Sequence, residues 1–415
     1  MKNKTMYIPL GMMFLLYFLI AFTTGLNNPF AKVIQTQFTL STFESQLGNF
    51  AFFISYLFMG IPASRVVRKI GYKKAALSAL VAMFLGVCVV FSGGNIGAIW
   101  VYLLGVFIMG CAITILQVVV NPLITVLGSK EGANTRMNFG GAGSSMGATF
   151  APLVVGLIIG NVAADKLVIA DVNPLLYIIL ALLALVFLVL SKVNIPETEL
   201  TQTEEDKVRG SALKFSNFRW GLVAIFLYVG MEVATANLTN MYMLNELAID
   251  AGIAGAIVGT YWLLMLVGRL IGAAIGTKVT SRPQLIIVSS IAFCLYIGAI
   301  IINPEIKVVM PAVDSHFQLL FAQVPINVLL LVLVGLCTSV MWTCIFILAT
   351  EGLGRYTNQA SGIFMMMVCG GAVIPALQGR LVDVFGFIPS YWVGLVCVLV
   401  ILLYGIFVKK NKIIV

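Results

Sequence analysis

The sequence predicts an all-α polytopic membrane protein with 12 transmembrane helices in two six-helix halves. The 415 residues are 60% hydrophobic and only 10% charged, whereas soluble domains carry about 25% charged residues. Apolar windows of roughly 20 residues, the length that crosses a bilayer, recur along the chain. The ten-residue alternation typical of an outer-membrane β-barrel is absent, so the backbone polar groups must be satisfied within helices.

Polar breaks separate the predicted transmembrane helices. These helices cover residues 7–27, 46–67, 75–93, 98–127, 137–161, 173–193, 218–243, 253–276, 284–303, 325–350, 359–382 and 388–409. The longest internal polar stretch follows the sixth helix and contains several Glu residues. We therefore expect an N-terminal bundle at 1–193, a cytoplasmic linker at 194–217 and a C-terminal bundle at 218–415.

An internal repeat supports the division into halves. The pattern Gly-x4-Pro-x3-Gly occurs at residues 147–156 in the fifth predicted helix and again at residues 370–379 in the eleventh. These are equivalent helices if each half contains six. Such parallel repeats are typical of secondary transporters that bind substrate between their halves, near the middle of the membrane.

The charge pattern predicts the orientation. The net charge is +9, and most of the 25 Lys and Arg residues fall on loops of one side. The positive-inside rule places that side, and both termini, in the cytoplasm. We therefore expect a multi-pass protein of the bacterial inner membrane, and the basic charge reports topology rather than a nucleic-acid partner.

Several classes of protein are disfavoured by missing motifs. The seven cysteines lie in apolar runs without zinc spacing, and the single histidine, His316, lies in a polar stretch without clustered ligands. We expect no metal site. A polytopic enzyme would need a cluster of acidic, His or metal-binding groups. A Gly-x4-Gly-Lys-Ser/Thr signature is also absent, so we expect no nucleotide or other cofactor, and ion gradients supply the energy.

Polar residues within spans are the candidate site residues, because burying them in a membrane is costly. In the N-terminal half, Asn27 and Asn28 precede Pro29, where the helix is interrupted. Gln117 and Asn121 are four residues apart and share a helical face. Carboxamides suit sugar hydroxyls. The alternatives are a helix kink capped by its own asparagines and hydrogen bonds that join neighbouring helices.

In the C-terminal half, Glu232 is the acidic residue that we place within a span, and Asn237 follows on the same helix. A membrane carboxyl can carry a coupling proton, unless a cation or an arginine holds it ionised. Arg269 is the candidate charge partner, although it could instead extend to the inner face. Trp342 is a candidate for stacking on a substrate ring, whereas most membrane aromatics serve packing or anchoring.

These residues resemble the fucose/galactose/glucose:proton symporter family of the major facilitator superfamily, on its glucose/galactose branch. The most specific stretch is Gln117-x3-Asn121-Pro122-x2-Thr125-x-Leu127-Gly128, and similarities extend over nearly all 12 spans. The resemblance implies the facilitator fold and a sugar substrate with ion coupling. Further similarities are Leu26-Asn27, Ile70 to Lys74, Arg136-Met-Asn, Tyr228 to Glu232, Gly268 to Gly272, and Gly370-Gly-x3-Pro375.

The chain also departs from the family. Asn28 replaces an aspartate that carries the proton in the family, and Gln117 replaces the glutamate of the fucose branch. Two sugar-holding residues of the family correspond to Gly141 and Ser144. These small residues would enlarge the sugar pocket or allow close helix packing.

We therefore expect a monomeric secondary transporter that imports a monosaccharide, a hexose or an amino-sugar, by alternating access. In this hypothesis Asn27, Asn28, Gln117, Asn121, Asn237 and Trp342 bind substrate, while Glu232, Asn28 and Gln117 couple H⁺ or Na⁺. Uncoupled facilitation and the export of sugars or amphiphilic drugs are the alternatives. A channel is disfavoured because the repeat favours alternating access.

Overall fold

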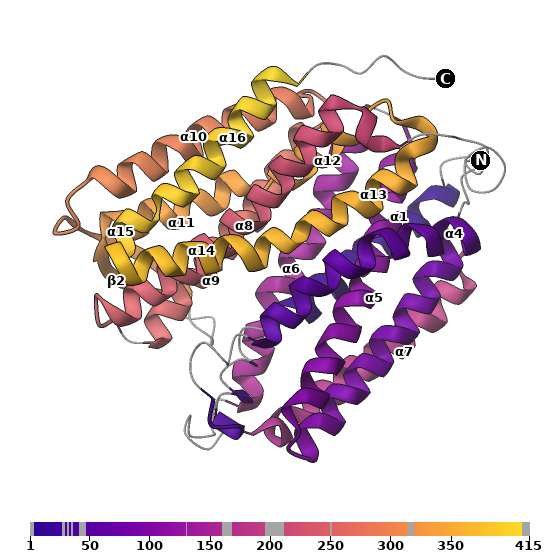
Figure 1. The fold of residues 1–415 in the computed structure, drawn as a ribbon, viewed down its shortest axis with the longest axis horizontal. Coiled ribbons are helices and arrows are strands. Elements are labelled where there is room, and N and C mark those ends of the chain that lie inside the picture. Colours follow the sequence, from indigo (N-terminus) through magenta and orange to yellow (C-terminus); the bar gives the residue numbers. More distant parts are fainter. Residues whose placement is uncertain are drawn as a thin grey trace.

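The computed structural model describes residues 4–26, 30, 33–34, 36–40, 47–129, 131–159, 168–195, 211–249, 251–313 and 319–408. Over these ranges the chain is a bundle of long helices (Figure 1). The helices of the N-terminal half are α1 (Lys4–Gly25), α4 (Leu47–Asn95), α5 (Ile99–Val126), α6 (Ala133–Ile159), η1 (Ile169–Val172) and α7 (Asn173–Lys192).

The C-terminal half lies beside it, coloured from pink to yellow (Figure 1). Several of its membrane helices are interrupted, so that one predicted span contains two or three shorter helices. They are η4 (Ala212–Lys214), α8 (Ser216–Asn245), α9 (Ala251–Ile275), α10 (Ser281–Ile301), α11 (Ile326–Thr338), α12 (Met341–Thr350), η5 (Gly354–Tyr356), α13 (Thr357–Met366), η6 (Met367–Cys369), α14 (Gly370–Phe385), α15 (Phe387–Ser390) and α16 (Trp392–Phe407).

The number of membrane crossings agrees with the sequence. Among the described residues, 10 helical segments are long and apolar enough to cross a membrane. One of these segments is α4, whose 49 residues contain two predicted spans joined at Gly71. The Gly- and Ser-rich α6 is less apolar, but its 27 residues are also long enough to cross. Counting α4 twice and including α6 is consistent with the predicted 12 helices.

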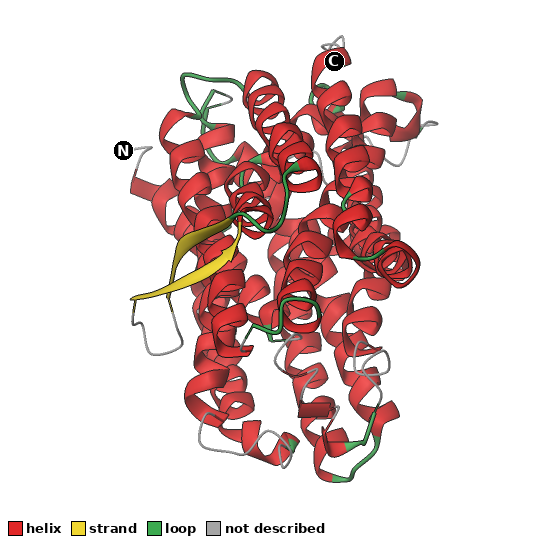
Figure 2. Ribbon diagram, turned by 90° about the vertical axis from the view of Figure 1, so that its left-hand side faces the viewer, coloured by secondary structure: helices red, strands yellow, loops and turns green. Residues whose placement is uncertain are grey.

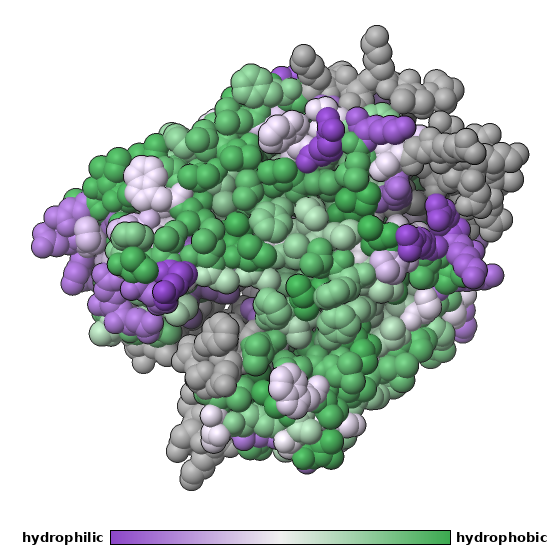
Figure 3. Space-filling view, viewed as in Figure 1, coloured by the Kyte–Doolittle hydropathy of each residue, from purple (hydrophilic) through white to green (hydrophobic). Residues whose placement is uncertain are grey.

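A tight turn joins the two halves of α4. Gly71 has φ 83° and ψ 168°, a conformation that residues with a side chain rarely adopt. Basic residues surround this turn, and we call this end of the molecule the basic end: Arg65, Arg68, Lys69, Lys73 and Lys74. Figure 3 shows apolar residues over most of the visible face and hydrophilic residues gathered toward its two ends.

A β-hairpin between α10 and α11 was not predicted, so the fold is not purely helical. Its strands β1 (Lys307–Val313) and β2 (Leu319–Pro325) pair antiparallel, with Lys307 opposite Pro325 (Figure 2). Buried Met310 and Ala312 alternate with exposed Val309 and Pro311. This period of two is typical of a strand with one covered face. In the sequence the segment is too short for this pattern to distinguish a strand from a loop between two long apolar helices.

The repeated glycines occupy equivalent places in the two halves. In the N-terminal half, α6 packs against α1, and a Cβ at Gly147 would overlap the backbone oxygen of Phe18. In the C-terminal half, α14 packs against α8, and a Cβ at Gly370 would overlap the backbone oxygen of Phe226. Each repeat therefore lets the fifth helix of its half approach the backbone of the first helix.

Within the described residues, two helix pairs make the most extensive contacts between the halves. On one side, α13 packs against α4, where a Cβ on Gly362 would lie 2.5 Å from the oxygen of Gly60. On the other side, α6 packs against α9. Near the start of α6, Asn134 donates a 3.4 Å hydrogen bond to the carbonyl of Val279. Because α6 starts and α9 ends at the basic end, the halves are closed together there.

Candidate functional site

Two predicted binding residues, Asn27 and Asn28, lie outside the described residues, and their roles stay predictions. The predicted loop residue His316 also lies outside the described residues.

Gln117 lies on α5 with its amide oxygen unpaired. Its amide nitrogen donates a 3.2 Å hydrogen bond to the hydroxyl of Tyr56 on α4. The amide oxygen is buried and has no hydrogen-bond partner in the described part of the chain. Buried polar atoms are nearly always hydrogen-bonded. The hydrogen bond to Tyr56 therefore holds the amide nitrogen of Gln117 in place, while its amide oxygen is available as an acceptor.

Asn121 is fully buried one turn further along α5, and both ends of its amide have partners. Its oxygen accepts a hydrogen bond from Tyr17 on α1 at 2.5 Å, and its nitrogen contacts the sulfur of Met365 on α13 at 3.8 Å. These partners come from two different helices, one in each half. The arrangement favours the packing alternative for Asn121 rather than direct substrate contact.

Arg269 on α9 binds backbone carbonyls and does not extend to the basic end. Its Nε donates a 3.1 Å hydrogen bond to Ser339, where the break between α11 and α12 interrupts the span. Its Nη1 donates a 2.6 Å hydrogen bond to Gly141 on α6 of the other half. Arg269 therefore crosses the interface between the halves.

Gly141 is one of the two small residues at the family's sugar-holding positions. A Cβ there would lie 3.2 Å from Cδ of Arg269 and 3.5 Å from its Nε. The arginine side chain covers this position, so the missing side chain at Gly141 does not leave an open sugar pocket. Of the two predicted alternatives, close packing holds for Gly141.

Glu232 is half-buried on α8, and its carboxylate lies within electrostatic range of Arg269. The two groups form no direct ion pair in the described residues. The buried hydroxyl of Tyr228, one turn earlier on α8, lies close enough to the Glu232 carboxylate and the Arg269 guanidinium to interact with both. A carboxyl, a guanidinium and a phenol therefore meet at one place.

Trp342 on α12 extends this group. Its indole packs edge-on against Tyr228, with ring centroids 6.3 Å apart, and against Phe364 of α13 at 5.9 Å. The indole is half-buried, as is Asn237 further along α8. Trp342 therefore lies beside the polar group around Glu232, and its stacking on a substrate ring stays a prediction.

Tyr17 connects the polar residues of the two halves. Its hydroxyl binds Asn121, one helical turn from Gln117, and its ring lies within electrostatic range of Arg269. The site so assembled runs from Gln117 through Tyr17 and Arg269 to Glu232. These four residues come from α1, α5, α8 and α9, and Tyr56 of α4, Tyr228 of α8 and Trp342 of α12 lie beside them. Only tertiary packing brings these side chains together.

Three tyrosines of this site were not among the predicted site residues: Tyr17, Tyr56 and Tyr228. Tyr228 had a usable signal, since it lies four residues before Glu232 and therefore on the same helical face. Tyr17 and Tyr56 have no such signal, because their partners lie on other helices.

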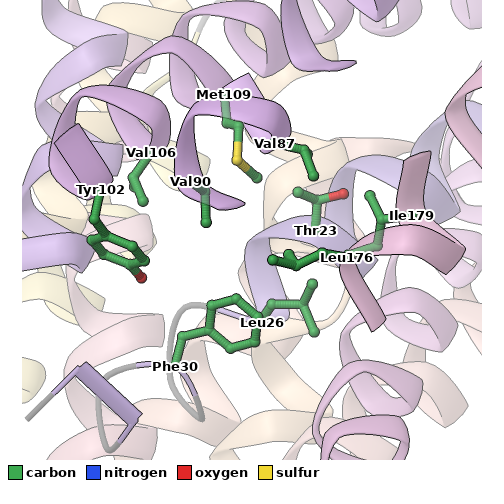
Figure 4. Close-up of a pocket in the computed structure, with 10 residues that line it drawn as sticks. All are labelled: Thr23, Leu26, Phe30, Val87, Val90, Tyr102, Val106, Met109, Leu176 and Ile179. Atoms are coloured by element: carbon green, nitrogen blue, oxygen red, sulfur yellow. The ribbon is translucent and has the colours of Figure 1, made fainter. Parts of the chain in front are cut away.

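A separate cavity lies within the N-terminal half. It is lined mainly by apolar side chains of α1, α4, α5 and α7 (Figure 4). None of the predicted site residues lines it, and Thr23 and Tyr102 supply its few polar atoms. Sugar sites need several converging polar groups, so we assign this cavity to helix packing. Within the described residues no group of three or more His, Cys, Asp or Glu side chains could hold a metal ion.

Many membrane-spanning helices in two halves, with polar groups gathered at their interface, define a membrane transporter. The model of the Major Facilitator Superfamily matches residues 13–374, and the chain belongs to this superfamily. It is a multi-pass transporter and not an enzyme. Its predicted membership of the fucose/galactose/glucose:proton symporter family is confirmed by the relatives that follow.

The relatives cover nearly the whole chain. The glucose/galactose transporter of Brucella abortus (strain 9-941) is 30% identical over 410 residues, which are 96% of this chain and 93% of that protein. The L-fucose-proton symporter of Escherichia coli (strain K12) is 25% identical over 416 residues, 94% and 90% of the two chains. A crystal structure of the E. coli fucose:proton symporter matches with a TM-score of 0.82 at 23% identity, covering 98% of this chain and 100% of that one. The fold is therefore shared over the full length.

Proposed function

We propose that the protein imports a monosaccharide across the bacterial inner membrane by alternating access, coupled to H⁺ or Na⁺. In this proposal it works as a monomer, has both termini in the cytoplasm and divides into the bundles 1–193 and 218–415 with a linker at 194–217. The relatives named for glucose, galactose and L-fucose support a hexose as substrate, and an amino-sugar is the second choice.

One observation carries the proposal: the buried amide oxygen of Gln117 has no hydrogen-bond partner in the described part of the chain, and it lies one helical turn from the contact of Asn121 with Tyr17. A sugar hydroxyl can donate a hydrogen bond to this oxygen. The half-buried Trp342 beside Tyr228 supplies an aromatic face for the sugar ring.

Glu232 is the coupling group in this proposal. Neither Gln117 nor Asn28 can titrate, although the family has carboxylates at these positions on some branches. Among the described residues, the Glu232 carboxylate is the acidic group beside Tyr228 and Arg269. A proton or a sodium ion that neutralises it would reduce the cost of moving the loaded site through the membrane.

The test is uptake by the purified protein in liposomes. Labelled D-glucose, D-galactose, L-fucose and N-acetylglucosamine are offered under an inward proton gradient, a sodium gradient or neither. We expect accumulation above the external concentration with one gradient, and its loss when an ionophore dissipates that gradient. Glu232→Gln should abolish accumulation while leaving sugar exchange between the two sides of the membrane.

The matched control is Glu246→Gln, which removes an exposed carboxylate just beyond the end of the same helix and should leave accumulation unchanged. Equal loss of accumulation and exchange in Glu232→Gln would make this residue a binding or folding group. Equilibration without accumulation under every gradient would instead support uncoupled facilitation. Sugar-sensitive efflux of a dye would support export.

A further inference from the structure

The contacts between α6 and α9 form a ladder that ends at Arg269. Starting at the basic end, Gly276 lies against Thr135, and a Cβ there would be 2.7 Å from its Oγ1. One turn further, Gly272 lies against Asn138, and the third step is Arg269 against Gly141. The first two steps are close contacts at glycines. The third is a charged hydrogen bond, whose strength depends on which other acceptors compete for the guanidinium.

The guanidinium has acceptors of two kinds. Its two hydrogen bonds reach neutral carbonyls, of Gly141 across the interface and of Ser339 within the C-terminal half. Its charged neighbour is the Glu232 carboxylate, which lies in electrostatic range without a direct ion pair. A carboxylate carries a full negative charge, so it attracts a guanidinium more strongly than a neutral carbonyl does. An ionised Glu232 therefore competes with Gly141 for Arg269.

The other titratable groups that face Arg269 are tyrosines. They are Tyr228 from α8 and Tyr17 from α1. The interrupted span α11 and α12 and the helix α6 face Arg269 with the backbone carbonyls of Ser339 and Gly141. Glu232 is thus the carboxyl group among the neighbours of Arg269.

We propose that Arg269 is a positioning residue through which the charge of Glu232 controls closure of the two halves at the basic end. When Glu232 is neutral, Arg269 binds Gly141 and holds α6 against α9. When Glu232 is ionised, its carboxylate draws the guanidinium away from Gly141, and the last step of the ladder opens. This role rests on the proposed function, in which Glu232 is the group that takes up and releases the coupling ion.

The test uses a thiol placed inside the ladder. Thr135→Cys is a suitable reporter because the hydroxyl of Thr135 is buried and has no hydrogen-bond partner in the described residues. Its labelling by a hydrophilic maleimide is measured on the purified full chain at one pH near 8. Rates are corrected for the labelling of the parent chain, which has seven native cysteines. Comparing variants at the same pH cancels the intrinsic reactivity of the thiol.

A double-mutant cycle tests whether Glu232 affects the labelling rate through Arg269. Glu232→Gln should slow labelling about tenfold, since a charged hydrogen bond shifts an equilibrium by roughly that factor. Arg269→Gln should leave the reporter accessible, and Glu232→Gln should then have no further effect. Arg282→Gln is the matched control, because Arg282 binds the carbonyls of Gly405 and Ile406 within the C-terminal half. It should leave the labelling rate unchanged.

Two results would overturn the proposal: no effect of Glu232→Gln on labelling, or the same effect with and without Arg269. If Arg269→Gln does not fold, Gly141→Ala replaces it, because the added methyl presses on the arginine and keeps both charges. It should raise labelling in the Glu232→Gln background. The assay needs neither sugar nor a gradient. If the protein accumulates sugar but the labelling rates do not depend on Glu232 and Arg269 as predicted, only the role of Arg269 is refuted. If the labelling rates behave as predicted but no sugar accumulates, only the proposed function is refuted.

Discussion

The repeated glycines allow a stability prediction that can be worked out from the packing. In Gly370→Ala the new methyl would meet the backbone oxygen of Phe226 and lie 2.8 Å from its carbonyl carbon. A backbone atom cannot rotate away as a side chain can, so α14 must move from α8. Overpacking of this kind costs about 1–3 kcal/mol. The gain in helix propensity from Gly to Ala returns at most about 1 kcal/mol.

We therefore expect Gly370→Ala to lower the free energy of unfolding by about 2 kcal/mol, the upper part of the overpacking range less the propensity gain. The last glycine of the same repeat supplies the control. A Cβ at Gly379, also on α14, would have no heavy atom within 4 Å. Gly379→Ala should be neutral or stabilising by up to about 1 kcal/mol.

The assay is thermal unfolding of the purified protein in detergent, followed by the reaction of its buried cysteines with a thiol-reactive dye. Cys344 and Cys397 are buried in the C-terminal half and become reactive when it unfolds. At about 2–4 °C for each kcal/mol, Gly370→Ala should melt roughly 4–8 °C lower than the parent. An unchanged melting temperature, or an equal fall in Gly379→Ala, would refute the close approach of α14 to α8.

Three further predictions follow from single contacts. Gln117→Ala removes an unpaired acceptor and should weaken sugar binding about two- to tenfold, measured by sugar-dependent thermal stabilisation, and an unchanged affinity would remove Gln117 from the site. Asn327→Ala leaves two carbonyls at the end of α10 without their donor and should cost roughly 1–3 kcal/mol of stability, which the dye assay would detect as a lower melting temperature. Asp383→Asn removes an exposed ion pair with Arg380 and should leave the melting temperature nearly unchanged, whereas a large fall would mean that this pair is stronger than its exposure allows.

Apolar periodicity and length predicted most of the fold. The spans predicted at 98–127, 173–193 and 284–303 correspond to α5, α7 and α10 within a few residues. This success has a physical reason, since a lipid-exposed segment must satisfy its backbone internally and must be long enough to cross. The interruptions at Ser339 and at Met367–Cys369 were not predicted, because each lies inside a segment that is apolar enough overall to cross a membrane.

The candidate site was predictable only in part. The rarity of polar residues in spans was enough to single out Glu232, Gln117 and Arg269, because each carries a high cost in lipid. It could not separate Asn121, whose partners use both ends of its amide, from Gln117, which keeps one end free. That distinction depends on which side chains of other helices reach each amide.

The sequence alone determined that this chain crosses a membrane many times, repeats a six-helix unit and carries few intramembrane charges. These properties follow from composition and spacing along the chain, because the hydrophobicity and length of a segment decide whether it can cross a membrane. The tertiary structure alone decided that Arg269 reaches across to Gly141 instead of extending to the basic end, and that Tyr17 joins the polar residues of both halves. A hydrogen bond needs two groups within about 3 Å, and for residues more than 100 positions apart only the packing of whole helices brings them that close.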